Sequence, residues 1–299
     1  MQLATMIVDG RPTLAVLLGG RLIDAATLGV GIASVADLAR AGTDGLQALR
    51  DAVAARPAVE GVPLPEAVLA PVVPRPGKIV AVGLNYRAHA DEVGLAAPER
   101  PLLFAKFPSS VLAHGGEIRW DAALTDQVDY EAELGVVIGQ TARNVDPADA
   151  LDHVLGYTCI NDVSARDLQA ADGQWVRAKS LDTFCPIGPV LVTADEIPDP
   201  QTLAISCSVN GEVLQQASTA DMFFRIRELI ALCSRSFTLE PGDVIATGTP
   251  SGIGLSRKPP RFLGEGDEVV VTIERIGSLA NRCHQAATGF ASRIADAIA

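Results

Sequence analysis

A proline-rich segment divides the chain into two unequal parts and limits the structure that either part can adopt. Six prolines lie within PAVEGVPLPEAVLAPVVPRPG, residues 57–77. Proline fixes its own φ angle and has no N–H to donate, so this stretch favours extended chain and cannot continue a helix. We therefore predict a boundary near residues 72–77, with a small N-terminal domain over residues 1–72 and a larger domain over residues 73–299. A chain of 299 residues has room for both.

The segment before the prolines is predicted to be a small α/β unit. Short apolar runs in residues 5–25 are interrupted by DGR at residues 9–11 and GGR at residues 19–21, which are hairpin turn signals. In residues 34–55 the apolar side chains recur at helical spacing, and Ser34 can cap the start of that helix. We expect a strand meander followed by one or two helices.

Beyond the prolines the pattern changes to short apolar runs bounded by turn sequences. Examples of these turns are NG at residues 210–211, PGD at residues 241–243 and GEGD at residues 264–267. Runs of this kind between such turns indicate strands more than helices. The expected fold class is therefore α+β, with a mostly β larger domain.

Charge and cysteine usage exclude several classes of function. The 24 basic and 36 acidic residues give a net charge of −12, and no basic cluster is present, which argues against nucleic-acid binding. No apolar run approaches the roughly 18 residues of a membrane span, and the N-terminus lacks signal-peptide features. We expect a cytoplasmic protein that binds no membrane. The five cysteines are scattered without a C-x-x-C pair and are expected to be reduced core residues.

Three acidic residues alternate within an apolar segment, QVDYEAELGVVIG, at residues 127–139. Asp129, Glu131 and Glu133 are two positions apart, so a strand would turn all three to one face. They form either the solvated face of an edge strand or part of a cation site, because Mg²⁺ prefers carboxylate oxygens. Asp129 begins the run, and we assign it only a turn or solvent role.

A third acid for the same cation is available in CINDVSARDLQ, residues 159–169. Asp162 follows a short apolar run and precedes a stretch that can continue as a helix. Arg166 at i+4 and Gln169 at i+7 would then share its face. Alternatively, Asp162 caps a helix and pairs with Arg166 at the surface. The two glutamates of the alternating segment favour the cation site.

Acid–base and anion-binding candidates lie in three further segments. In AVGLNYRAHADEVG, His89 and Glu92 would touch within one helical turn, either as a pair that activates water or as a surface contact. Lys179 could meet a developing oxyanion or be a solvated charge. The small-residue loop ATGTPSGIG, residues 246–254, could hold a carboxylate through backbone amides and Thr249.

Six motifs in order resemble the fumarylacetoacetate hydrolase family, in particular its bacterial acylpyruvase-like and hydroxyheptadienedioate isomerase/decarboxylase-like branch. They span about residues 75–283, and residues 1–70 resemble the small N-terminal domain of some members. The resemblance implies a mixed β-roll catalytic domain, usually in a homodimer, with Mg²⁺ or Mn²⁺ in the site. The motifs are GLNYRAHADE, LLFAKFPSS, VDYEAELGVVIG, NDVSARDLQ, AKSLDTFCPIGP and EPGDVIATGTPSGIG.

The resemblance also implies roles for individual residues. Animal fumarylacetoacetate hydrolases use a further aspartate ligand before the lid, and no acid near LNYRAH matches it, which argues against fumarylacetoacetate as the substrate. His89 and Glu92 match a water-activating pair on a mobile lid. The metal-ligand positions match Glu131, Glu133 and Asp162. The substrate-contacting positions match Arg166, Gln169, Thr249 and Lys179, the last also a catalytic cation.

Such a site predicts an enzyme that cleaves acylpyruvates. A 2-oxo acid can bind a cation through its carboxylate and keto oxygens. In a 2,4-dioxo acid, attack of water at C4 would break the C3–C4 bond and release the enolate of pyruvate, as in aromatic catabolism. The alternatives are a 2-oxo acid decarboxylase or a hydroxydienedioate isomerase that uses the same enolate, and a non-catalytic oxo-acid binder. The acid–base pair argues against a binder.

Overall fold

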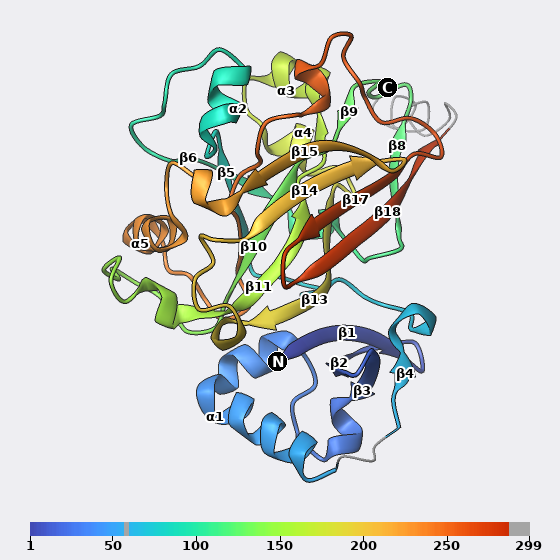
Figure 1. The fold of residues 1–299 in the computed structure, drawn as a ribbon, viewed down its shortest axis with the longest axis vertical. Helices are drawn as coiled ribbons and strands as arrows, with labels where there is room; N and C mark the ends of the chain where they lie inside the picture. Colours follow the sequence, from blue (N-terminus) through green and yellow to red (C-terminus); the bar gives the residue numbers. More distant parts are fainter. Residues whose placement is uncertain (57–59, 287–299) are drawn as a thin grey trace, which may run out of the picture.

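The computed structural model describes residues 1–56 and 60–286 as an α+β fold in which strands predominate (Figure 1). The expected fold class is confirmed. The α-helices are α1 (Val35–Ala54), α2 (Arg87–Glu92), α3 (Arg166–Asp172), α4 (Val176–Lys179) and α5 (Ile226–Ser236). The strands are β1 (Gln2–Val8), β2 (Arg11–Leu18), β3 (Arg21–Asp24), β4 (Val62–Pro63), β5 (Ile79–Gly83), β6 (Leu102–Lys106), β7 (Val111–Leu112), β8 (Glu117–Asp121), β9 (Val128–Asp129), β10 (Ala132–Ile138), β11 (Val154–Asn161), β12 (Ser164–Ala165), β13 (Cys185–Thr193), β14 (Ala204–Val209), β15 (Glu212–Ser218), β16 (Val244–Ala246), β17 (Glu268–Ile273) and β18 (Gly277–Ala286).

Two sheets form the body of the described chain. The larger is mixed, with eleven strands in the order β4-β3-β2-β1-β13-β11-β10-β16-β5-β6, and β7 pairs separately with β13. The smaller has five strands in the order β15-β14-β17-β18-β8 and lies across β10 and β11 (Figure 1). Apolar side chains from both sheets, such as Leu134 of β10 and Cys207 of β14, share one buried cluster. One part of the core therefore lies between the sheets, and a second buried cluster includes Leu3 of β1, Leu38 of α1 and Val137 of β10.

The N-terminal part of the chain forms the meander and helix that the sequence predicts. β1 pairs antiparallel with β2 and β2 with β3, through turns at residues 9–10 and 19–20 that adopt positive φ angles. Ser34 Oγ accepts a hydrogen bond from the Asp37 amide at 3.0 Å and caps α1. Gly42, with φ 63° and ψ −147°, breaks α1 into two helical segments. The choice between one helix and two is thus resolved by a single glycine.

The two parts of the chain share the larger sheet. β1 pairs antiparallel with β13, with Gln2 opposite Val192 and Leu3 opposite Leu191. The N-terminal meander, at the lower end of Figure 1, therefore extends the sheet that carries β10 and β11. The boundary near residue 72 stays a prediction. The larger predicted domain, 73–299, also includes residues 287–299, which lie outside the described residues.

The acidic segment lies in the centre of the larger sheet. β10 pairs with β11 on one side and with β16 on the other, and all of its residues are buried. The interpretation as a solvated edge-strand face is therefore wrong. Strand geometry is interrupted at residues 130–131, between β9 and β10.

Two whole-chain expectations concern the cysteines and the membrane. All five cysteines are free and buried, as expected for core residues. Within residues 1–56 and 60–286, no helix combines the length and apolar character that crossing a bilayer demands.

Candidate active site

Three buried carboxylates converge where β10 begins and β11 ends. Glu131 precedes β10, Glu133 lies within it, and Asp162 follows β11 directly. Antiparallel pairing of Ala132 with Asn161 brings these positions together. One oxygen of each acid lies within 4.8 Å of the others. The structure thus gathers the three predicted metal ligands, and their role as ligands stays a prediction.

Buried lysines balance two of these carboxylates. Lys179 Nζ lies 2.7 Å from Glu131 Oε2 and 2.8 Å from Asp162 Oδ2. Because Lys179 is only 2% exposed, its interpretation as a solvated surface charge is wrong. Lys106 Nζ lies 2.6 Å from Asp162 Oδ1 and is equally buried. The sequence analysis missed Lys106, for which the apolar neighbours in LLFAKF were the available signal.

Glu133 differs from its two neighbours because no side-chain cation in the described chain pairs with it. Its Oε2 accepts a hydrogen bond from the Gly248 amide at 2.8 Å. Burial raises the pKa of Glu133 well above its ordinary value, and the two neighbouring carboxylates raise it further. Burial also opposes ionisation of Glu131, but the charges of Lys179 and Arg166 prevail and lower its pKa to about 2. A divalent cation would supply the positive charge that Glu133 lacks, so this oxygen donor set fits Mg²⁺ or Mn²⁺.

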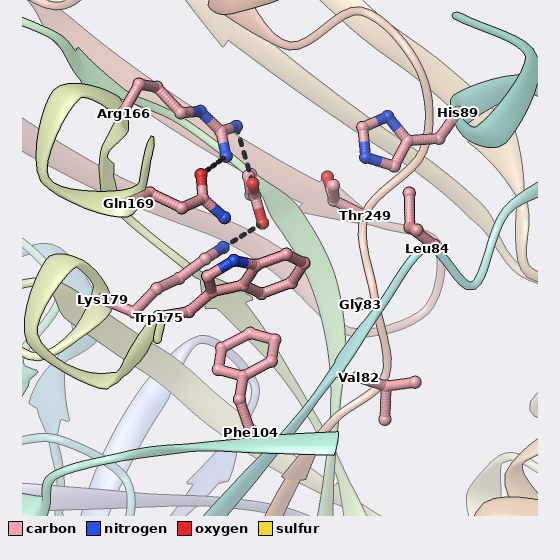
Figure 2. A pocket seen from close by; sticks show the side chains of 11 residues that line it. Val82, Gly83, Leu84, His89, Phe104, Arg166, Gln169, Trp175, Lys179 and Thr249 are labelled. Carbon is pink, nitrogen blue, oxygen red and sulfur yellow. Dashed lines mark hydrogen bonds and ion pairs between the residues drawn. The ribbon is translucent and has the colours of Figure 1, made fainter. Parts of the chain in front are cut away.

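Arg166 and Gln169 lie at the start of α3 and both line the pocket (Figure 2). Arg166 Nη2 lies 2.6 Å from Glu131 Oε1, and Nη1 donates to Gln169 Oε1 at 2.9 Å. Asp162 is not on this helix, because β12 intervenes and pairs with β9. Both expectations about Asp162 and Arg166, a shared helix face and a surface cap, are therefore wrong.

Asp129 is fully buried, so the expected turn or solvent role is wrong. Its Oδ2 accepts from Arg166 Nε at 2.8 Å, and its Oδ1 accepts from the Gly254 amide at 2.7 Å. The period-2 alternation with Glu131 was the signal in the sequence. It was discounted because an acid at the start of a strand is commonly solvated.

His89 and Glu92 both lie on α2, as the single helical turn predicts. His89 Nδ1 is 3.1 Å from Glu92 Oε2, and His89 itself lines the pocket (Figure 2). Glu92 Oε1 accepts from the Gly252 amide at 2.9 Å, which holds α2 against the loop that follows β16. His89 is therefore buried and Glu92 partly buried beside the pocket, so the pair is no ordinary surface contact.

The loop at residues 247–255 donates backbone amides to acids from three separate segments. The prediction that its amides could hold a carboxylate applies here to the protein's own carboxylates. Thr249 lines the pocket, and its Oγ1 accepts from Gln215, a buried residue that the sequence analysis missed. The amide contacts run from Gly248 to Glu133, from Gly252 to Glu92 and from Gly254 to Asp129.

One pocket joins most of these groups (Figure 2). Phe104 and Trp175 form part of its apolar wall, with ring centroids 5.3 Å apart in an edge-to-face arrangement. Three predicted site residues do not line the pocket, namely Glu92, Glu133 and Asp162. The predicted residues that line it are His89, Glu131, Arg166, Gln169, Lys179 and Thr249.

Comparison with known proteins supports the resemblance noted in the sequence. Residues 78–284 match the family model described as fumarylacetoacetate (FAA) hydrolase C-terminal. The chain belongs to the fumarylacetoacetate hydrolase family. It is 48% identical over 222 residues to oxaloacetate tautomerase YisK of Bacillus subtilis, a match that covers 73% of this chain and 74% of the relative.

Solved structures of this family share the whole architecture. A fumarylacetoacetate hydrolase from Exiguobacterium antarcticum superimposes with a TM-score of 0.80 at 38% identity, covering 96% of this chain and 100% of the other. A maleylpyruvate hydrolase from Sphingobium sp. SYK-6, in complex with manganese(II) and pyruvate, gives 0.79 at 34% identity over 95% and 99% of the two chains. A relative with this fold thus holds a divalent metal and a 2-oxo acid.

Proposed function

We propose that this chain uses a divalent cation to interconvert the keto and enol forms of a small 2-oxo acid, with oxaloacetate as the first candidate substrate. The observation that carries the proposal is Glu133, a buried carboxylate without a cation, next to a pocket lined by Lys179 and Arg166. The identity of 48% with the Bacillus subtilis tautomerase supports oxaloacetate.

The residues around the three carboxylates have distinct tasks in this proposal. Glu131, Glu133 and Asp162 would hold Mg²⁺ or Mn²⁺, which supplies Lewis-acid stabilisation of the charge that develops at the C2 oxygen. The Lys179 ammonium, fixed between Glu131 and Asp162, adds positive charge on the same side. Arg166 would bind a substrate carboxylate. Its donor fork suits that group better than a point charge does.

His89 is the residue best suited to move the proton. Tautomerisation takes a proton from C3 and places one on the C2 oxygen, without consuming water. If His89 Nδ1 donates to Glu92 Oε2, at 3.1 Å, then Nε2 is free to accept a proton. Glu92 thereby fixes both the tautomer and the orientation of the ring.

Hydrolysis of an acylpyruvate is the second candidate, and the same pair favours it. Here Nε2 of His89 would take a proton from water as the water oxygen bonds to C4. The C3–C4 bond would break, its electrons would form the pyruvate enolate, and C3 would then be protonated. Similarity to the maleylpyruvate hydrolase, at 34% identity, supports this reaction. Decarboxylation and hydroxydienedioate isomerisation also proceed through such an enolate and stay alternatives.

A substrate panel separates these reactions by their products. Protein stripped with EDTA and reloaded with Mg²⁺ or Mn²⁺ is assayed on enol oxaloacetate, acylpyruvates and hydroxydienedioates. A tautomerase accelerates loss of the enol absorbance while total oxaloacetate is conserved. A decarboxylase releases CO₂, and a hydrolase forms pyruvate with a second acid. Unchanged enol decay would contradict the tautomerase, and full activity in excess EDTA would contradict the metal site.

Three further properties complete the proposal. The donor set accepts either Mg²⁺ or Mn²⁺, and comparing turnover with each identifies the better activator. We also propose that the protein is cytoplasmic and homodimeric. Light scattering of the purified full-length chain tests the dimer.

A further inference from the structure

We propose that Asp129 is a positioning residue that fixes the Arg166 guanidinium for binding the substrate carboxylate. The inference rests on the proposed function for the ligand, a 2-oxo acid on a divalent cation. It goes beyond that function in assigning a task to an acid that itself meets neither metal nor substrate.

The hydrogen bonds of Asp129 show why it cannot be a ligand. Its Oδ1 accepts from the Tyr130 amide at 2.8 Å and from the Gly254 amide at 2.7 Å. Its Oδ2 accepts from the Leu255 amide at 3.0 Å and from Arg166 Nε at 2.8 Å. A carboxylate offers about four lone-pair sites, so both oxygens are fully used. Any effect of Asp129 on the ligand must therefore act through the groups that it holds, Arg166 and the loop at residues 247–255.

The Arg166 guanidinium keeps donors for a ligand only because of how it is held. Asp129 takes the single Nε–H, while Nη1 donates to Gln169 and Nη2 faces Glu131. Arginine has five N–H donors, so each Nη nitrogen retains at least one. Nη2 is fully buried, and its contact with Glu131 lacks hydrogen-bond geometry. Arg166 lines the pocket, so a carboxylate bound there would meet the donors that these contacts leave free.

Asp129 also ties Arg166 to the loop that carries Thr249. A Cβ on Gly254 would lie 2.6 Å from Asp129 Oδ1, so the loop passes the carboxylate at a distance that only glycine permits. One side chain therefore sets the relation between the start of α3 and the loop at residues 247–255. The start of α3 contributes Arg166 to the pocket lining, and the loop contributes Thr249 (Figure 2).

The charge of Asp129 is as important as its shape. Arg166 is buried, and its positive charge is shared between Asp129 and Glu131. Asp129→Asn keeps the shape of the side chain but replaces one acceptor oxygen by an NH₂ group. This NH₂ donor would then face one of the N–H groups that donate to Asp129 in the wild type. Arg166 would turn toward Glu131, the only acid left to pair with it. Its free donors would then leave the pocket.

The test measures oxalate binding to the Mn²⁺-loaded protein by calorimetry. Asp129→Asn should weaken oxalate binding by at least about tenfold, the effect of misplacing one charge-assisted contact. Mn²⁺ affinity should stay within about twofold of wild type, since the three acids that converge are unchanged. In turnover, KM should rise more than kcat falls, which a general loss of structure would not produce.

Asp243→Asn is the matched control. Asp243 is also a buried acid that pairs with a cation, Lys78, and accepts backbone amides, but it does not line the pocket. Its replacement should lower the melting temperature and leave oxalate affinity unchanged.

Arg166→Lys provides a second route if Asp129→Asn does not fold. Lysine keeps the charge but has no Nε–H for Asp129, so oxalate binding should fall to a similar degree. Wild-type affinity in Asp129→Asn overturns this inference alone, whereas wild-type affinity in Arg166→Lys also removes Arg166 from the proposed substrate site. Failure of Mn²⁺-loaded wild type to bind oxalate overturns the proposed function together with it.

Discussion

At the scale of single residues, the three carboxylates differ in the charge that surrounds them. Glu131 and Asp162 contact buried lysines, whereas Glu133 accepts, among the residues that the structure describes, a single hydrogen bond from the Gly248 amide. A buried carboxylate without a cation is costly when ionised, and the pKa of Glu133 therefore lies well above its ordinary value. This difference gives Glu133 a pH dependence opposite in sign to that of a salt-bridged acid.

The first prediction concerns stability in EDTA. As pH rises past about 4.3, the unfolded chain releases the Glu133 proton before the native state does, so the native state binds more protons. The contribution of Glu133 to stability is therefore present at low pH and is lost as pH rises through its raised native pKa. Urea denaturation should show wild type losing stability relative to Glu133→Gln as pH rises above about 4.3. Saturating Mn²⁺ should stabilise wild type and have little effect on the variant. Parallel pH profiles with and without Glu133 would contradict this account.

The second prediction concerns His89. If its ring moves protons, His89→Ala should slow turnover by about 10²–10⁴-fold. Oxalate affinity of the Mn²⁺-loaded protein should not change, because the carboxylates and Arg166 are intact. A joint loss of turnover and oxalate binding would instead assign His89 to ligand binding.

Local spacing was sufficient to find some site residues and not others. His89 and Glu92 are three positions apart, and Glu131 and Glu133 two, so helix and strand geometry place each pair together. Lys106 pairs with Asp162, 56 positions away, and Gln215 donates to Thr249, 34 positions away, which no local pattern encodes. Asp129 was visible in the alternation, but its burial depends on the loop at residues 247–255 closing over it.

At the scale of elements, α2 and the segment after it have few ties to the rest of the molecule. Residues 93–101 are largely exposed, and α2 itself is only six residues long. The contact from Glu92 to the Gly252 amide is one of its links across the pocket. A segment with so little buried apolar surface opens at low cost.

The third prediction follows for hydrogen exchange. Exchange across residues 87–101 should slow markedly when oxalate and Mn²⁺ are added together, because a ligand in this pocket would contact His89, which lines it. The amides of α5, which lines no part of this pocket, serve as the internal reference. Equal protection of residues 87–101 with and without ligand would rule out a lid.

Element types were more predictable than element boundaries near the site. The meander, the capped α1 and the turn at α2 follow from hairpin signals, a serine cap and helical spacing. The helix expected after Asp162 starts later than predicted, because α3 begins only at Arg166. Pairing of β12 with β9 takes the intervening residues, and such pairing joins segments about 35 positions apart. Tertiary hydrogen bonding therefore overrode local helical preference.

At the scale of the whole molecule, the N-terminal meander belongs to the same hydrogen-bonded sheet as β10 and β11, which carry the candidate site. The prolines of residues 57–77 indicated where the chain changes character. They could not indicate that β13 pairs with β1, which lies about 190 positions earlier in the chain. A boundary in sequence composition is thus compatible with a continuous sheet.

The fourth prediction concerns removal of residues 1–72. The truncation exposes the edge of β13 and the apolar side chains packed with Leu191, which invites edge-to-edge association. We expect aggregation or a lower melting temperature, measured by light scattering and thermal denaturation against the full chain. A soluble, monodisperse fragment with unchanged melting temperature and Mn²⁺ affinity would show instead that the boundary separates independent domains.

The loop at residues 247–255 serves the site through its main chain, and this affects how the family can diversify. Amide donors survive almost any side-chain replacement, so an alanine scan of Ser251 or Ile253 would leave the contacts to Glu92 and Asp129 in place. A Cβ at Gly252 would lie 2.0 Å from the Leu214 carbonyl oxygen, so this position must remain glycine. The side chains of the loop can therefore change to suit other substrate acids while its main-chain contacts stay the same.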